Sequence, residues 1–331
     1  MPAVEAAAAP HGGRGRFAPS PTGDLHLGNA RTALLAWARA RRAGASFVMR
    51  VEDIDGPRTV PGALQGTLDE LRWLGVDWDE GPDVGGPAGP YRQSQRSERY
   101  QAALERLAQA GQTFACYLSR SDLREVASAP HGATGPVYGA AERAHNAVLA
   151  QQRAAAGRPA SVRFEPVPST LTLDDALHGQ VRFDTERDVG AVVLRRSDGL
   201  WSYALAVVVD DAAMGIEEVV RGDDLLAASG PQLALQVALG LRTPRYLHVP
   251  VLLDASGERM AKRRGDWTLR ALRERGTDPA RLRGALLASA GLLPAPEPLS
   301  VSDTLRVADA LLLRRDPSVW SAELDAFVAG G

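Results

Sequence analysis

The chain contains almost no lysine and almost no cysteine. Among 331 residues, Lys262 is the single lysine beside many arginines, and Cys116 is the single cysteine. One cysteine excludes an intramolecular disulfide, a zinc cage built from thiolates and a cysteine-rich secreted scaffold. The lysine count indicates a general replacement of lysine by arginine. The position that keeps lysine is therefore a candidate for a site that needs a compact cation.

Long apolar segments are also absent. No run approaches the ~18 consecutive apolar residues of a membrane helix. The first ten residues lack the basic and apolar regions of a signal peptide. With 45% hydrophobic and 24% charged residues, the composition is that of a globular protein. These features predict a soluble, cytoplasmic protein without a membrane partner, which begins with a disordered leader at residues 1–13.

The order of apolar segments predicts an α/β fold. From residue 14 a short segment leads through a Pro/Gly turn into a helix at 29–42, a strand at 46–51 and a helix at 61–74. Strands and helices alternating at this spacing are typical of a parallel sheet. A less regular region interrupts the pattern. We therefore expect a first half at 14–112, an inserted α+β subdomain at 113–189, a second half at 190–265 and a C-terminal helical region at 266–331.

The charge is unevenly distributed along the chain. Residues 259–283 contain nine cations and three acids, a local charge of +6, whereas the whole chain has a formal charge of −2. This asymmetry favours a local site for polyphosphate or nucleic acid. A solvated basic helix face is the alternative interpretation.

Two segments have residues suited to phosphate chemistry. In the first, residues 16–29, a rigid Pro-Ser-Pro turn and two glycines lead to the N-terminus of the predicted helix. Helix N-termini present free N–H groups and partial positive charge, so polyphosphates bind there. His26 can donate to a phosphate oxygen whose charge grows in the transition state. Taken alone, the His-x-Gly motif is weak, and an ordinary strand-to-helix turn with an incidental histidine is the simpler interpretation.

The second segment is Arg-Met-Ala-Lys-Arg at residues 259–263, on a loop that follows an apolar strand at 247–253. A lysine beside arginines on a loop suits the neutralisation of a leaving pyrophosphate. Lysine is a compact point charge, whereas arginine is a planar fork. A site that requires the compact geometry would resist the replacement by arginine seen elsewhere in the chain.

Together, the two segments resemble the two signature motifs of class I aminoacyl-tRNA synthetases. The matching residues are RFAPSPTGDLHLG at 16–28, RTAL at 31–34, RVEDID at 50–55, RRSDGLWSY at 195–203, the run 205–211 and VRGDDL at 220–225. They resemble the glutamyl branch and span about 14–293. The resemblance implies a Rossmann-like catalytic domain, an inserted acceptor-type subdomain and activation of L-glutamate with ATP and Mg²⁺.

Two features point to a shortened subfamily. Only 68 residues follow Arg263, too few for the anticodon-binding domain of a glutamyl-tRNA synthetase, so we expect none. Residues 51–63 resemble the variant found in glutamyl-Q tRNA(Asp) synthetases. Those paralogues activate glutamate without tRNA and transfer it to queuosine at the wobble position of tRNA(Asp). The resemblance thus implies queuosine-bearing tRNA(Asp) as a partner and a stem-contact role for the helical region.

The resemblance also assigns roles to individual residues. In the family, glutamate is contacted at the positions of Arg16, Phe17, Ala18, Pro19, Ser20, Glu52, Tyr203 and Arg221. Arginine binds carboxylates bidentately, a carboxylate pairs with the α-ammonium, and a tyrosine adds a hydroxyl. Considered singly, the two arginines could be surface cations, Glu52 a strand-end carboxylate and Tyr203 a core residue.

The ATP site is assigned in the same way. The resemblance implies that ATP is bound by His26, Gly28, Asn29 and Lys262, with His26 and Lys262 as the catalytic residues. Asn29 stands where the motif of the class has a second histidine, a position at which the glutamyl branch varies. Catalysis would then consist mainly of positioning and charge stabilisation.

The inserted region departs from the family pattern. Many relatives bind zinc there through Cys-x-Cys and Tyr-x₃-Cys. Here Cys116 and Tyr138 match, but Leu118 and Glu142 stand at the other two positions. Structural zinc needs four N, S or O ligands, and leucine supplies none. We therefore expect no zinc and no other metal site.

Three alternative functions are compatible with parts of the sequence. The nearest is a truncated glutamyl-tRNA synthetase core that charges a tRNA acceptor end. Another is a nucleotidyltransferase for a different small acid, against which the glutamate-binding set argues. The third is a non-enzymatic tRNA-binding paralogue. Such proteins often lose the motif histidine or lysine, and this chain keeps His26 and Lys262.

Overall fold

The structure of the chain is a computed structural model that describes residues 4–5, 12–119, 121–123, 137–258, 260, 267–308, 312–313 and 315–330. Lys262 lies outside the described residues, as does most of the remaining segment 259–266. Among the described residues, every helix is too short or too polar to span a membrane.

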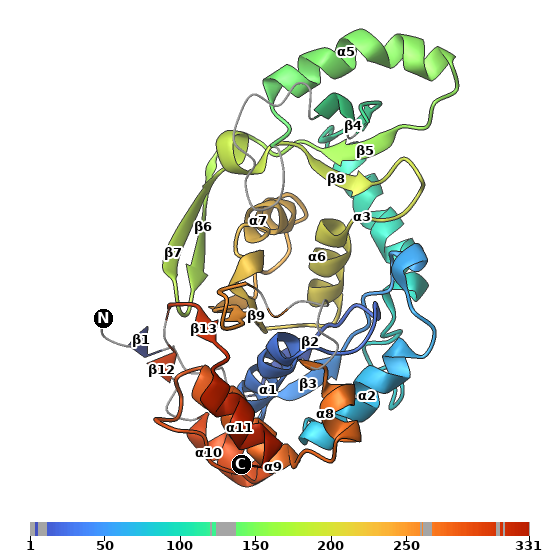
Figure 1. Ribbon diagram of the computed structural model, residues 1–331. Helices are drawn as coiled ribbons and strands as arrows, with labels where there is room; N and C mark the ends of the chain where they lie inside the picture. Colours follow the sequence, from blue (N-terminus) through green and yellow to red (C-terminus); the bar gives the residue numbers. More distant parts are fainter. Residues whose placement is uncertain are drawn as a thin grey trace.

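A six-stranded sheet lies at the centre of the molecule (Figure 1). Its order is β3-β2-β9-β10-β6-β7, and all neighbours are parallel except β6 and β7. The strands are β2 (Arg14–Phe17), β3 (Ser46–Met49), β6 (Thr170–Asp175), β7 (Gly179–Asp184), β9 (Glu218–Gly222) and β10 (Arg245–Val249). The predicted α/β fold with a parallel sheet is confirmed.

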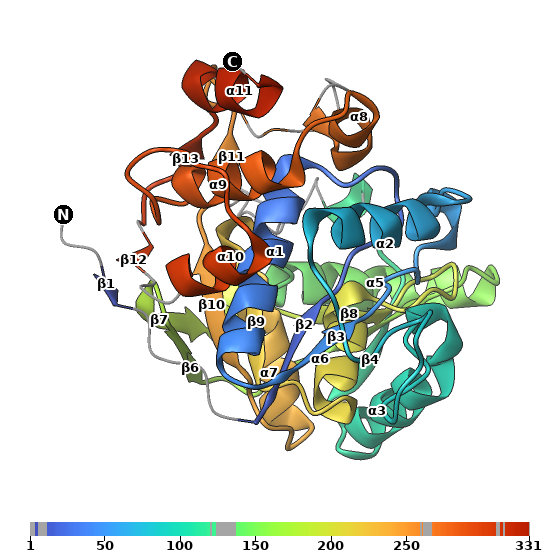
Figure 2. The same ribbon diagram turned by 90° about the horizontal axis from the view of Figure 1, so that it is seen from below.

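Helices cover both faces of this sheet (Figures 1 and 2). One face carries α1 (Leu27–Arg42), α2 (Ala63–Leu74), α8 (Leu269–Glu274) and α9 (Pro279–Ser289). The other carries α3 (Ser97–Gln109), α6 (Tyr203–Ala213) and α7 (Ser229–Ala238). Side chains alternate along a strand, so Phe47 and Met49 of β3 pack on the first face and Val48 on the second.

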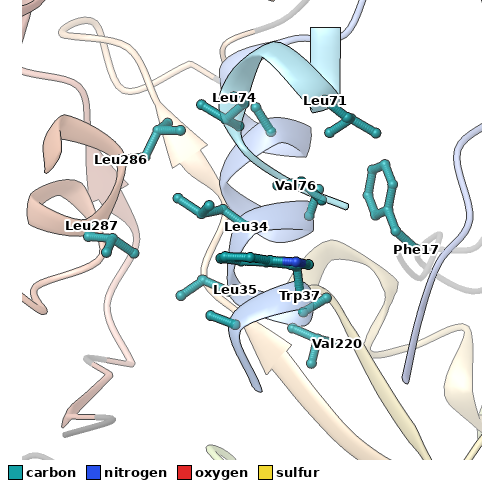
Figure 3. Close-up of a cluster of buried hydrophobic side chains, with 14 of the residues drawn as sticks. Phe17, Leu34, Leu35, Trp37, Leu71, Leu74, Val76, Val220, Leu286 and Leu287 are labelled. Atoms are coloured by element: carbon teal, nitrogen blue, oxygen red, sulfur yellow. The ribbon is translucent and has the colours of Figure 1, made fainter. Parts of the chain in front are cut away.

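The first face holds the largest hydrophobic cluster (Figure 3). Leu34 and Trp37 of α1 are buried in it, together with Leu74 of α2 and Leu286 of α9. Each such side chain contributes about 1.5–3 kcal/mol when fully buried. The C-terminal helices are therefore joined to the first half of the chain by a common core.

A second, smaller sheet lies beside the central one (Figure 1). It contains β4 (Thr113–Cys116), β5 (Ser161–Phe164) and β8 (Val192–Arg195), all antiparallel, near helix α5 (Ala140–Ala155). The β6–β7 hairpin lies within residues 113–189, the range expected for the insertion, and extends the central sheet. β8 lies in the expected second half of the catalytic domain and pairs outside the central sheet. β6 meets β10 at one register position, Tyr246 with Asp175, where the N–H of Ala176 donates to the carbonyl oxygen of Tyr246 at 2.9 Å.

Segments near the two ends of the chain pair with each other. Two residues of the expected disordered leader form β1 (Val4–Glu5), which pairs antiparallel with β12 (Leu312–Leu313). The tail of the chain thus supplies hydrogen-bond partners for these two residues of the expected leader. In addition, β11 (Leu252–Leu253) pairs parallel with β13 (Ser318–Val319), and α10 (Val301–Val307) and α11 (Ala322–Ala329) complete the tail.

Candidate active site

A cavity of about 600 Å³ opens where the parallel strands β2, β3, β9 and β10 end. Ligands of open α/β sheets bind at the carboxyl ends of the strands. Most of the predicted site lines this cavity, namely Arg16, Phe17, Ala18, Pro19, Ser20, His26, Gly28, Asn29, Glu52, Tyr203 and Arg221. The remaining predicted residue, Lys262, lies outside the described residues, but Met260 is at the cavity wall.

The N-terminus of α1 forms one end of the cavity. His26 is its N-cap residue and caps no backbone group with its side chain. The first hydrogen bond of the helix runs from Ala30 N to His26 O, so the N–H groups of residues 27–29 precede the helical ladder. Among the described residues, a Cβ added to Gly28 would meet Leu252 Cβ alone, at 3.8 Å. This end can therefore accept a phosphate close to the backbone.

Arg16 is 5% exposed, so it is not a surface cation. Its Nε lies 3.3 Å from Asp211 Oδ1, and its Nη2 lies 3.5 Å from Oδ2. Asp211 also accepts from Nη1 of the fully buried Arg50 at 2.5 Å. Burial acts to raise the pKa of Asp211, but the guanidinium groups of Arg50 and Arg16 hold it below its ordinary value. One ionised carboxylate thus positions two cations.

Glu52 follows β3 and faces the cavity, with Oε1 3.2 Å from Nη2 of Arg50. Burial raises the pKa of Glu52, although Arg50 and Arg16 oppose this shift. A cationic ammonium bound here would favour the ionised form. The carboxylate is therefore well placed to select a positively charged ligand group.

A buried network surrounds Asp210, whose Oδ2 lies 4.0 Å from Nε of Arg50. Asp210, next to Asp211 on α6, accepts hydrogen bonds from Arg96 Nε at 2.5 Å, Tyr100 OH at 2.8 Å and Gln93 Nε2 at 2.9 Å. Neither aspartate was among the predicted site residues. Their position at the end of an apolar run could have identified them, because buried carboxylates need cationic or hydrogen-bonding partners.

Arg221, at 4% exposure, is also no surface cation. Its Nε donates to His248 Nε2 at 2.9 Å, its Nη1 to Gln232 Oε1 and its Nη2 to Ser229 Oγ, both at 2.8 Å. Most of its fork is therefore engaged by the protein, and it offers the cavity a fixed charge with few open donors. Tyr203 begins α6 and is 37% exposed at the cavity, so it is not a core residue.

The expected remnant of the zinc motif lies in the small sheet. Cys116 and Tyr138 are buried together, and the guanidinium of Arg163 lies 4.3 Å from the centre of the Tyr138 ring. Glu142 Oε2 accepts from Gly139 N at 2.8 Å and so caps α5. Within the described part of the chain, no three His, Cys, Asp or Glu side chains are grouped to hold a metal.

The basic stretch at 259–283 is only partly available to a ligand. Arg270 pairs with Asp24 at 3.0 Å. Arg281 donates to the carbonyl oxygen of Phe327 at 2.9 Å. The buried Arg283 donates to the carbonyl oxygens of Leu74 and Leu299. These three arginines have partners within the protein. Fewer cations of this stretch are therefore available to a ligand than the sequence suggested.

Comparison with protein families assigns the catalytic part of the chain. Residues 14–293 match the model of the catalytic domain of class I tRNA synthetases (E and Q). The glutamate-tRNA synthetase from Elizabethkingia anophelis has a similar structure, with a TM-score of 0.81 and 26% identity. The similarity covers 96% of this chain and 70% of that one.

Several curated relatives are similar in sequence. The glutamyl-Q tRNA(Asp) synthetase of Symbiobacterium thermophilum is 47% identical over 96% of this chain and 98% of its own length. That of Nitratidesulfovibrio vulgaris is 45% identical, covering 94% and 96%. Glutamate–tRNA ligase 2 of Acidithiobacillus ferrooxidans is also 45% identical, but covers 82% of this chain and 57% of its own length.

Proposed function

We propose a function from one premise: the chain belongs to the class I tRNA synthetases of the glutamyl and glutaminyl type, a family of ATP-using ligases. In this proposal it activates L-glutamate with ATP, without tRNA, and transfers glutamate to queuosine at the wobble position of tRNA(Asp). One observation carries the proposal. The carboxylate of Glu52, the guanidinium groups of Arg16 and Arg221 and the N-terminus of α1 all line one cavity.

In the activation step, an α-carboxylate oxygen of glutamate attacks the α-phosphorus of ATP. The bond from that phosphorus to the bridging oxygen breaks, which gives glutamyl-adenylate and pyrophosphate. The N–H groups at the start of α1 and the side chain of His26 bind the triphosphate on one side. Lys262 neutralises charge on the leaving pyrophosphate, with Mg²⁺ accompanying ATP. Positioning and charge stabilisation supply the catalysis.

Glutamate is recognised by groups of opposite charge. Glu52 pairs with the α-ammonium, while Arg16 and Arg221 attract the carboxylates. Tyr203 adds a hydroxyl hydrogen bond. Because Asp211 and His248 already hold the two arginines, little reorganisation is required when glutamate binds.

In the transfer step, a hydroxyl of the queuosine cyclopentenediol attacks the carbonyl carbon of glutamyl-adenylate. An ester bond forms, the bond from carbon to the phosphate oxygen breaks, and AMP leaves as the hydroxyl proton is released. Two relatives named as glutamyl-Q tRNA(Asp) synthetases support this acceptor, since they match over nearly their whole length.

The test combines ATP, labelled glutamate and tRNA(Asp), with and without queuosine. We expect pyrophosphate exchange that depends on glutamate but needs no tRNA, and label only on queuosine-bearing tRNA. Glutamate–tRNA ligase 2 matches this chain at 45% identity, the same value as the relative from Nitratidesulfovibrio vulgaris. The test must therefore distinguish transfer to queuosine from charging of the acceptor end. Removing the terminal adenosine of the tRNA should leave labelling unchanged. Loss of the label after this removal would instead support acceptor-end charging.

A further inference from the structure

Three buried side chains from neighbouring strands form a line beneath the cavity. Asp175 ends β6, His248 belongs to β10 and Arg221 to β9, and these strands are adjacent in the sheet. Arg221 and His248 are direct partners in the β9–β10 register. His248 Nδ1 lies 2.7 Å from Asp175 Oδ2, and His248 Nε2 lies 2.9 Å from Arg221 Nε. All three are at most 5% exposed.

The direction of these hydrogen bonds follows from their chemistry. The Nε of arginine can only donate, so His248 Nε2 must accept. The imidazole proton therefore resides on Nδ1 and is donated to Asp175. Burial lowers the pKa of His248, and Arg221 acts in the same direction against Asp175. The neutral Nδ1–H tautomer is thus the form compatible with this geometry.

Asp175 is itself held rigidly. Its Oδ2 accepts from the backbone N–H of His248 at 3.0 Å, and its Oδ1 accepts from the N–H groups of Leu177 and His178, each at 2.9 Å. Burial acts to raise the pKa of Asp175, but the hydrogen bonds from His248 and the backbone lower it. The ionised carboxylate can only accept, so it enforces the tautomer of His248.

We propose that Asp175 is a positioning residue that acts through His248 on Arg221 and thereby sets the affinity for glutamate. The inference rests on the proposed function. Arg221 lines the cavity, whereas Asp175 and His248 do not. Asp175 therefore acts on the ligand through the orientation of the guanidinium. The ring of Tyr246 is stacked on the imidazole of His248, with 5.6 Å between the ring centres, and so restricts the tilt of the imidazole.

The variant Asp175→Asn tests this relay with little change in volume. An asparagine amide can donate to Nδ1, which permits the Nε2–H tautomer and leaves two donors facing each other at Arg221. In glutamate-dependent pyrophosphate exchange, we expect the KM for glutamate to rise about tenfold or more, with an unchanged KM for ATP. The matched control is Asp174→Asn, the exposed neighbour on β6, which should behave like the wild type.

A second measurement is independent of activity. In ligand-free wild type, ¹⁵N NMR should show His248 as the Nδ1–H tautomer, and Asp175→Asn should shift it towards Nε2–H. An Nε2–H tautomer in the wild type would overturn the relay, as would a folded Asp175→Asn variant with an unchanged KM for glutamate. Absence of glutamate-dependent exchange in the wild type would count against the proposed function and leave the NMR result to decide the relay.

A pair of variants at His248 covers the case in which Asp175→Asn does not fold. In His248→Gln, the amide oxygen can still accept from Arg221, whereas His248→Leu offers no acceptor. The glutamine variant should therefore retain a lower KM for glutamate than the leucine variant, with the same KM for ATP in both. Equal KM values for glutamate in these two variants would contradict the proposal.

Discussion

Arg16 and Asp211 form an ion pair although 195 positions separate them in sequence, with Nε of Arg16 3.3 Å from Oδ1 of Asp211. Asp211 simultaneously accepts from Arg50. The same carboxylate therefore orients a cation at the cavity wall and neutralises one that is wholly buried. The charge arrangement of the site and the stability of the sheet depend on a common residue.

Asp211→Ala should destabilise the fold strongly. It leaves Arg16 and Arg50 without this partner, and removal of one member of a buried ion pair costs about 3–5 kcal/mol of unfolding free energy. Urea unfolding measures the loss. The control is Asp198→Ala, which removes an exposed partner of Arg196 and should cost less than about 1 kcal/mol. A similarly small loss for both variants would contradict the structural role of Asp211.

Gly28→Ala should separate ligand binding from stability. Within the described part of the chain, the added methyl group has Leu252 Cβ as its one neighbour, at 3.8 Å, so these residues accommodate it. Alanine is favoured over glycine inside a helix by up to about 1 kcal/mol. The melting temperature should therefore stay equal or rise, while the methyl group narrows the cavity and raises the KM for ATP in pyrophosphate exchange. An unchanged KM for ATP would show that no phosphate approaches this position.

Gly284, unlike Gly28, has no room for a methyl group and lies away from the cavity. A Cβ on Gly284 would overlap the carbonyl oxygen of Glu297. Gly284→Ala should therefore lower the melting temperature, even though it also introduces a better helix former. Catalytic constants measured well below the transition should remain close to the wild type, because this glycine lies outside the cavity.

The cavity-lining residues could be predicted because they occupy local motifs. Arg16 and Phe17 end β2 and residues 18–20 follow it directly, Glu52 follows β3 and Arg221 is on β9. Parallel strands bring their carboxyl ends together, so residues in these positions meet in space. The burial of each side chain then decides between the alternative interpretations. Arg16 and Arg221 are enclosed, so they are not surface cations, and Tyr203 is open to the cavity, so it is not a core residue.

The partners of these residues could not be predicted in the same way. Asp175 lies 73 positions from His248, and nothing in its local sequence distinguishes it from the adjacent Asp174. Their difference arises only because alternate side chains of β6 face opposite sides of the sheet. The pairing of β6 with β10 could not be predicted for a related reason, since the partner of a strand is not visible in the strand's own sequence pattern.

Binding of the substrate glutamate should weaken on acidification. The weakening should begin at a higher pH than the titration of an exposed glutamate side chain would cause. Burial raises the pKa of Glu52, and only the ionised form attracts an ammonium. As the pH falls, Glu52 therefore becomes protonated above the ordinary value of about 4.3, and the KM for glutamate rises. Glu52→Gln should have a high KM for glutamate that depends little on pH. A wild-type profile with its rise at or below the ordinary value would contradict this prediction.

The purified protein should contain no stoichiometric zinc. Leu118 cannot ligate a metal, and the carboxylate of Glu142 already caps α5. Elemental analysis is the direct measurement, and a chelator should leave the melting temperature unchanged. Cys116 and Tyr138 remain close together, so the double variant Leu118→Cys with Glu142→Cys should gain zinc. About one zinc per wild-type chain would contradict the prediction.

Lys262→Ala should lower the rate of activation far more than the affinity for glutamate. In the proposed step, Lys262 stabilises charge on the leaving pyrophosphate, which develops only in the transition state. The effect should therefore appear in kcat of pyrophosphate exchange, with a small change in the KM for glutamate. Replacement of Arg273, an exposed cation on α8, by alanine is the control for a general loss of positive charge.

Lys262→Arg keeps the charge and isolates the effect of shape. The planar guanidinium distributes its charge over a larger fork than the compact ammonium does. If the site needs the compact cation, kcat should fall in this variant as well, which would explain why lysine persists at this position of an arginine-rich chain. Full activity of Lys262→Arg would remove the compositional argument, while a simultaneous loss in Lys262→Ala would still identify the charge itself as necessary.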